Sequence, residues 1–254
     1  MKQLALSTIT AHAFRQHREA CLRYMTAHRD EYATWAILIT PDRTDPEVVW
    51  GRAVFAVLSA RERFANGCAA FVAFTRLGRA VVGNMSLAEV RAIGIAAGLS
   101  MPNEKARRIR ALGVFLVNNG GPAWLLQTSH EAQQGQGGWR AYRERLMAVP
   151  GLARTKASFL ACLLYPTEAD CACLDTWILR VFANGTTTVN RPQYEAIERR
   201  IRQWGKLAGM ASTFVAQWAV WDHARGVQET HGVLMGLPGG HKDETPYRPQ
   251  AGER

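Results

Sequence analysis

Apolar residues recur at spacings of three and four along most of this chain, and this periodicity constrains the fold more than any other feature. Residues three and four apart lie on one face of a helix, whereas a half-buried strand needs apolar residues at alternate positions. Alternating runs of Val, Ile and Thr are nearly absent. The pattern predicts an all-α protein with helices at about 10–28, 45–60, 62–76, 86–97, 103–117, 139–149, 154–164, 175–183, 191–207 and 211–226.

Local signals mark some boundaries of these helices. Asp45 before Pro46, and Ser86 three residues before Glu89, are typical of helix starts. The segment 32-YATWAILIT-40 fits either a strand or a buried helix, and we take it as a helix. The runs 118-NNGG-121 and 134-QGQGG-138 indicate loops, and residues 232–254, rich in Gly, Pro and charge, indicate a disordered tail.

The charge balance favours a polyanionic partner. The chain has 31 Lys and Arg against 21 Asp and Glu, a net charge of +10, which does not by itself choose among DNA, RNA and a membrane surface. No apolar run reaches the roughly 20 residues of a membrane span, and the N-terminus lacks the apolar core of a secretory signal, so we expect a cytoplasmic protein. The 5 cysteines are scattered, and 171-CAC-173 has no second Cys/His pair, so we expect free or buried thiols and no metal site.

A helix hairpin is the most informative local motif. In 140-RAYRERLMAVPGLARTKASFLACLL-164 one helix ends at Val149, Pro150 and Gly151 form a turn, and a second helix starts near Arg154. The first amides of the second helix have no partner within it, so they form an anion site that fits a DNA phosphate. Such turns also occur in ordinary helix bundles. Basic residues of the hairpin would add charge, although about half could simply be a solvated face: Arg140, Arg143, Arg145, Arg154 and Lys156.

The hairpin and a following Asp together resemble a known pattern. The segments 149-VPGLARTKA-157 and 174-LDT-176 are similar to the signature of the helix-hairpin-helix, Gly-Pro-Asp (HhH-GPD) DNA glycosylase superfamily, typified by endonuclease III and the oxoguanine glycosylases. Upstream, 54-VFAVLSARERFANGCAAF-71 and 98-GLSMPNEKARRIRAL-112 look like two other helices of that family. The resemblance covers about residues 45–225.

The resemblance implies a two-lobed helical fold with an active-site cleft between the lobes. Residues 1–44 and 176–231 would form one lobe, and residues 45–175, containing the hairpin at 140–164, the other. The partner would be double-stranded DNA with a damaged or modified base, bound by a monomer in the cytoplasm at the nucleoid. No cysteine follows residue 175, so we expect no iron–sulfur cluster there, although hairpin carbonyls could hold a monovalent cation.

The resemblance also assigns roles to single residues. Asp175 would stabilise positive charge on the sugar as the base leaves, a role compatible with capping the next helix. Arg61 would fill the gap left by the flipped base or contact the orphaned partner base, or it is an ordinary surface residue. Trp177 would line the base pocket, whereas Trp218 and Trp221 are interpreted as ordinary packing. The DNA strand would lie against the hairpin residues Gly151, Ala153, Arg154, Thr155 and Lys156.

Two departures from the family pattern keep alternatives open. Ala153 replaces the second glycine of the hairpin, and Thr155 stands where bifunctional members carry a Schiff-base lysine. Lys156 is one residue later, a rotation of about 100° on a helix, so we expect its amine to point away and contact phosphate. The first hypothesis is a monofunctional glycosylase. The others are a glycosylase/lyase that uses Lys156, and a helix-hairpin-helix DNA-binding protein without excision activity.

Overall fold

The computed structural model describes residues 18–59, 64–183 and 188–226, and every regular element in these stretches is a helix. The prediction of an all-α protein is therefore confirmed. Residues 18–27 are helical, which agrees with the expected first helix. Arg61 and the expected tail at 232–254 lie outside the described residues.

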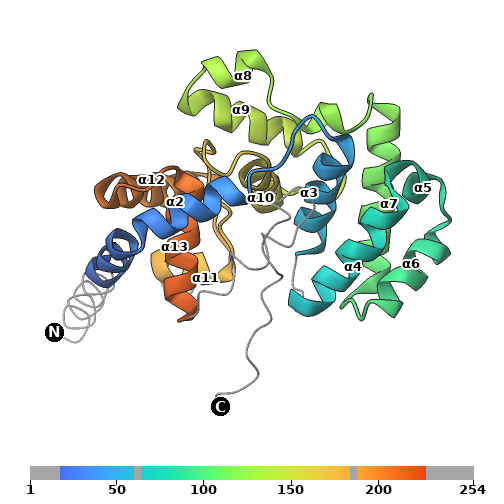
Figure 1. Cartoon of the computed structure of the whole chain (residues 1–254), viewed down its shortest axis with the longest axis horizontal. Helices are drawn as coiled ribbons and strands as arrows, with labels where there is room; N and C mark the ends of the chain where they lie inside the picture. Colours follow the sequence, from blue (N-terminus) through green and yellow to red (C-terminus); the bar gives the residue numbers. More distant parts are fainter. Residues whose placement is uncertain (1–17, 60–63, 184–187, 227–254) are drawn as a thin grey trace.

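One group of helices gathers around α13, on the left of Figure 1. The helix α13 contacts each of the other three, and it brings the N-terminal part of the chain against the C-terminal part. The members of this group are α2 (Arg29–Leu38), α11 (Thr176–Phe182), α12 (Arg191–Ala208) and α13 (Thr213–Arg225).

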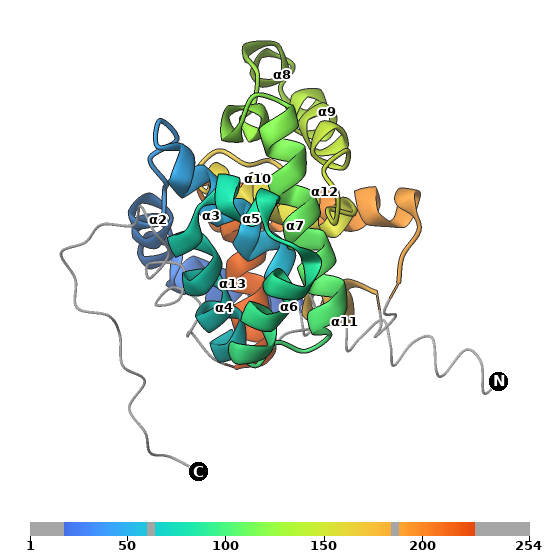
Figure 2. The same cartoon turned by 90° about the vertical axis from the view of Figure 1, so that its right-hand side faces the viewer.

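A second group of helices packs around α7, on the right of Figure 1. The helix α7 contacts α3, α5 and α6, and Figure 2 shows α5 and α6 beside it. Its Gly113 allows this close approach, because a Cβ atom there would lie 2.9 Å from the backbone nitrogen of Gly83 in α5. The members are α3 (Pro46–Leu58), α4 (Phe64–Leu77), α5 (Arg79–Asn84), α6 (Leu87–Ala96) and α7 (Pro102–Asn118).

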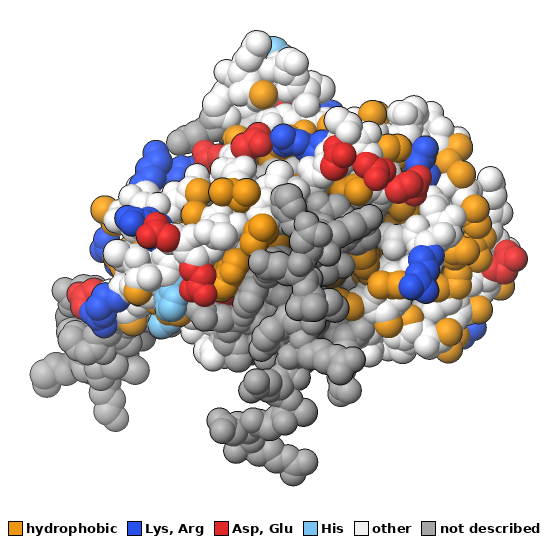
Figure 3. All heavy atoms as spheres, viewed as in Figure 1, with side chains coloured by type: hydrophobic (Ala, Val, Ile, Leu, Met, Phe, Trp, Pro, Cys, Tyr) orange, Lys and Arg blue, Asp and Glu red, His pale blue; other side chains and the backbone are white. Residues whose placement is uncertain are grey.

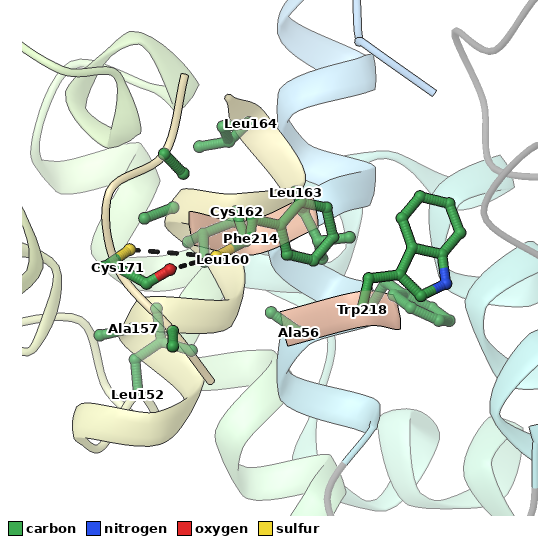
Figure 4. Close-up of a cluster of buried hydrophobic side chains, with 14 of the residues drawn as sticks. Ala56, Leu152, Ala157, Leu160, Cys162, Leu163, Leu164, Cys171, Phe214 and Trp218 are labelled. Atoms are coloured by element: carbon green, nitrogen blue, oxygen red, sulfur yellow. Dashed lines mark hydrogen bonds between the residues drawn. The ribbon is translucent and has the colours of Figure 1, made fainter. Parts of the chain in front are cut away.

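The helix hairpin lies between these two groups. It consists of α9 (Gln136–Leu146) and α10 (Arg154–Leu164), preceded by the 3-10 helix η1 (Pro122–Leu125) and by α8 (Ser129–Gln133). The helix α10 packs against α9 and α3. Figure 4 shows Ala157 and Leu160 of α10 in one buried cluster with Ala56 of α3 and Trp218 of α13. The hairpin is therefore held by helices of both groups, while the lobe boundaries expected at 44/45 and 175/176 stay a prediction.

The helix starts predicted from N-cap residues are confirmed. Asp45 accepts hydrogen bonds from the amides of Glu47 and Val48, and Ser86 and Glu89 form the expected capping box. The ambiguous segment 32–40 is helical through Leu38 as part of α2. The short helices α5 and α8 and the 3-10 helix were not predicted. The loop expected at 134–138 is wrong in its second half, because α9 already begins at Gln136.

Charged side chains of both signs share the face shown in Figure 3, where basic and acidic groups alternate across the upper part. The excess of positive charge is therefore not gathered into one patch on this face. No helix among the described residues is long and apolar enough to cross a bilayer. Four of the five cysteines are buried, and Cys68 is half-buried.

A buried ion pair connects α9 to α12. Nη1 of Arg143 donates to Oε1 of Glu198 over 2.6 Å, and the amide of Ala172 donates to the same oxygen over 2.8 Å. Arg143 is 1% exposed and Glu198 is 7% exposed. Burial raises the pKa of Glu198, and the guanidinium of Arg143 opposes that shift. This carboxylate therefore ties three segments of the chain together.

Replacing Glu198 with Ala is expected to lower the free energy of unfolding by about 3–5 kcal/mol, because it leaves a buried guanidinium without its anion. Glu195, three residues earlier on α12, provides the control, since it pairs at the surface with Arg191 and Arg140. Glu195→Ala should cost about 0–1 kcal/mol. Denaturant titration measures both values, and equal losses would contradict the structural role given to Glu198.

Candidate active site

An extended segment between α10 and α11 leads to Asp175, and two helices hold its backbone. The carbonyl of Ala172 accepts a hydrogen bond from the Tyr194 hydroxyl over 2.5 Å, while its amide donates to Glu198, and both partners lie on α12. The next amide, that of Cys173, donates to Oε1 of Gln217 on α13 over 2.6 Å. Hydrogen bonds to successive peptide groups fix the path of the chain two residues before Asp175.

Asp175 is the N-cap of α11, as its sequence context predicts. Its Oδ1 accepts hydrogen bonds from the amides of Trp177 and Ile178, both over 3.0 Å. Its Oδ2 accepts a third hydrogen bond, over 2.6 Å, from the indole nitrogen of Trp221 on α13. The side chain is half-buried. Three donors thus fix a carboxylate at the positive end of a helix dipole.

The turn of the hairpin has the geometry expected of its sequence. Gly151 has φ +88°, in the left-handed region that favours glycine. A Cβ atom there would meet the side chain of Arg108 on α7 at 3.1 Å, so this side chain covers the turn. Ala153 is exposed and is the N-cap of α10, with no side-chain hydrogen bond to the first turn. The guanidinium of Arg154 lies 5.8 Å from the centre of the Tyr194 ring.

The amine of Lys156 turns inward, donating a hydrogen bond to Oγ of Ser59 at the end of α3 over 2.7 Å. Its expected contact with a DNA phosphate stays a prediction. The amine also lies 5.4 Å from the centre of the Phe159 ring. A lysine side chain has four flexible bonds, so the rotation of its Cα by one helix position does not fix where the amine lies. Thr155, at the position of the family's lysine, is half-buried.

The surroundings of Lys156 alter its charge. Burial lowers the pKa of this amine, and the nearby cations Lys105 and Arg108 on α7 lower it further, whereas Cys173 and Asp175 act in the opposite direction. Burial raises the pKa of the Cys173 thiol to about 12, and Lys156 opposes that change. The half-buried amine of Lys156, its partner Ser59 and the carboxylate of Asp175, which raises the pKa of the amine, come from α10, the end of α3 and the segment before α11.

Two arginines expected to contribute charge for DNA binding have structural partners instead. Arg143 is buried in its pair with Glu198. Arg145 donates to the carbonyls of Trp124 and Leu126 and pairs with Glu131, which fixes the chain around η1 to α9. Their position on α9 does not reveal this, because the partners lie outside that helix, at 14 residues for Glu131 and 55 residues for Glu198 along the chain. Arg140 remains half-exposed, 3.4 Å from a carboxylate oxygen of Glu195.

Sequence reasoning missed residues of this site that come from distant helices. In the sequence Ser59 stands out only as part of the segment 54–71, and helical spacing predicts ordinary packing for Trp221 beside Trp218. Trp218 does pack in the core, at 2% exposure. Trp177, expected in the base pocket, is half-buried with the guanidinium of Arg180 at 4.2 Å from its ring centre. Its role toward a base stays a prediction, as does that of Arg61, which lies outside the described residues.

Two surface hollows of about 480 and 470 Å³ lie away from this group, between residues 18–27 and α12. Neither is lined by Asp175 or Lys156, and their lining carries no carboxylate, so we give them no role in the chemistry. A nucleobase pocket beside Asp175 therefore stays a prediction, as does a cation at the hairpin carbonyls. Within the described stretches, no three His, Cys, Asp or Glu residues are grouped so as to hold a metal ion.

The chain folds as an all-helical protein in which a helix hairpin is followed by a capped aspartate. Solved structures of 8-oxoguanine DNA glycosylases share this fold. The enzyme from Thermotoga maritima matches with a TM-score of 0.61 at 18% identity, covering 84% of this chain and 98% of that one. The enzyme from Methanocaldococcus jannaschii matches with a TM-score of 0.59 at 16% identity, covering 85% and 95%.

A second structure from Methanocaldococcus jannaschii, an 8-oxoguanine glycosylase/lyase in complex with DNA containing 8-oxoguanine, matches with a TM-score of 0.61 at 15% identity. The match covers 81% of this chain and 97% of that one. No protein-family model matches the chain, and no curated protein sequence matches it. The likeness extends over nearly the whole of each solved chain, so the expected fold is confirmed.

Proposed function

We propose that this protein is a DNA glycosylase that hydrolyses the N-glycosidic bond of a damaged or modified base rotated out of duplex DNA. The observation that carries the proposal is a fixed carboxylate, that of Asp175, in the segment that follows the helix hairpin. The carboxylate is fixed by three donors, and its charge raises the pKa of Lys156 on the hairpin helix. Under this proposal the hairpin would hold the DNA strand, and Asp175 would act on the sugar.

Breaking an N-glycosidic bond develops positive charge on the sugar. A fixed carboxylate stabilises that charge, and it can orient or deprotonate the attacking water. The base leaves with the bonding electron pair, and water supplies the hydroxyl group at the anomeric carbon. Asp175 suits this role because backbone amides and an indole hold it in place before any substrate binds. The exposed end of the hairpin, at Ala153, would meet a phosphate of the same strand.

Lys156 supports a second candidate, a glycosylase/lyase. A neutral amine is the nucleophilic form of lysine, and burial lowers the pKa of this one. In this reaction the amine attacks the anomeric carbon, the base departs, and the opened sugar forms a Schiff base with the lysine. Loss of a proton from C2′ and departure of the 3′ phosphate with the bonding electron pair then break the strand. Water replaces the lysine when the Schiff base is hydrolysed.

A screen of duplexes tests the proposed function. Each duplex carries one oxidised, alkylated, deaminated or mismatched base, and we start with 8-oxoguanine because the similar solved enzymes act on it. We expect one class of duplex to give abasic sites, detected as strand breaks after alkali. Salt-sensitive duplex binding with no abasic product from any class would instead identify a helix-hairpin-helix DNA-binding protein.

A further inference from the structure

The second oxygen of Asp175 has a partner that helix capping does not require. The two amides that donate to Oδ1 belong to α11 itself, and any N-cap aspartate uses such amides. The donor to Oδ2 is the indole nitrogen of Trp221, 46 residues away on α13. Capping alone would leave the carboxylate free to turn about its Oδ1 contacts. The indole removes that freedom, because it fixes the second oxygen and therefore the plane of the group.

Several hydrogen bonds connect α13 and its N-cap to the segment before α11, and Trp221 makes the last of them. Oγ of Ser212 donates to the carbonyl of Pro166 over 2.8 Å, and Thr213 donates to Asp170. Farther along the helix, Gln217 accepts from the amide of Cys173, and Trp221 donates to Asp175. Gln217 and Trp221 are four residues apart, so they lie on one face of α13. From Ser212 to Trp221 the partners run from Pro166 to Asp175, so α13 and the segment before α11 follow each other in parallel.

The neighbouring tryptophan shows that the contact at Trp221 is not a general property of this helix. Trp218 lies in the apolar cluster of Figure 4, and its indole nitrogen is buried with no hydrogen-bond partner. Trp221 is half-buried instead, and the guanidinium of Arg225 lies 4.3 Å from its ring centre. The indole of Trp218 thus packs in the apolar core, whereas the indole of Trp221 donates a hydrogen bond to a carboxylate.

We propose that Trp221 is a positioning residue for base excision, whose indole N–H sets the direction in which Asp175 presents its carboxylate to the sugar. This inference rests on the proposed function. A misplaced catalytic group slows a reaction without weakening substrate binding, because the DNA is held elsewhere, at the hairpin. The single-turnover rate should therefore depend on the N–H group, and duplex affinity should not.

Three variants test this role on a duplex that the wild-type protein excises. Trp221→Phe keeps an aromatic ring but has no donor, and we expect its single-turnover rate to fall about 10- to 100-fold with unchanged duplex affinity. Trp221→His restores a ring N–H donor and should recover part of that loss. Trp218→Phe is the matched control, since it removes a packed indole from the same helix. It should lower the melting temperature and leave the rate unchanged.

The outcomes separate this inference from the proposed function. A wild-type rate in Trp221→Phe, with excision abolished in Asp175→Asn, would overturn the positioning role and leave the glycosylase standing. Equal losses of rate in Trp221→Phe and Trp218→Phe, with no recovery in Trp221→His, would also overturn it, because packing alone would explain them. A wild-type rate in Asp175→Asn would overturn the proposed function itself.

Discussion

Replacing Asp175 with Asn is expected to slow base excision by about 10²- to 10⁴-fold while duplex binding persists. The substitution removes the negative charge that stabilises the sugar cation, but it keeps an oxygen that can cap α11, since Asn and Asp are equally good N-caps. The change falls at the position of Oδ2, where the amide NH₂ of Asn would face the indole N–H of Trp221. Single-turnover excision under excess protein measures the effect.

Asp45 offers a control for the loss of charge at a helix cap. It is the N-cap of α3, at the opposite end of that helix from Ser59, and it accepts hydrogen bonds from two backbone amides, as Asp175 does. Asp45→Asn should leave excision unchanged. If both variants slow excision equally, the carboxylate of Asp175 serves the helix and not the reaction.

The parts of the fold that followed from sequence are those decided by neighbouring residues. The turn at Gly151 needs a left-handed backbone conformation, and the caps at Asp45 and Ser86 need oxygen atoms two or three residues before the amides they bind. The prediction of a loop over 134–138 is wrong in its second half, because close backbone packing outweighs the low helix propensity of glycine. A Cβ atom on Gly138 would overlap the carbonyl of Glu131, so glycine there serves close backbone contact inside a helix.

The site was only half predictable, and the reason is the distance along the chain between its members. The hairpin and Asp175 are visible because they belong to one short motif. The partner of Lys156, however, is Ser59, 97 residues away, and the partner of Asp175 is Trp221, 46 residues away. Helical spacing gives the face on which a residue lies, but a long side chain follows whichever distant partner packs against it. The burial of Arg143 against Glu198, 55 residues away, could not be predicted for the same reason.

If Lys156 acts as a nucleophile, borohydride is expected to trap a covalent protein–DNA adduct that is lost completely in Lys156→Ala. The adduct should form more readily as pH rises, because only the neutral amine attacks. The half-buried amine binds Ser59, and the charged or titratable groups that act on its pKa are Lys105, Arg108, Cys173 and Asp175. Burial and the two cations lower its pKa, so the midpoint of the pH profile should lie below the value of about 10.4 for an exposed lysine.

Lys206 provides the matched control, because it is an exposed lysine on α12, and Lys206→Ala should leave the yield of adduct unchanged. An adduct that survives Lys156→Ala would assign the chemistry to another amine. If no adduct forms at any pH while alkali still reveals abasic sites, Asp175 alone promotes hydrolysis. The inward turn of the Lys156 side chain would then serve charge balance and not covalent attack.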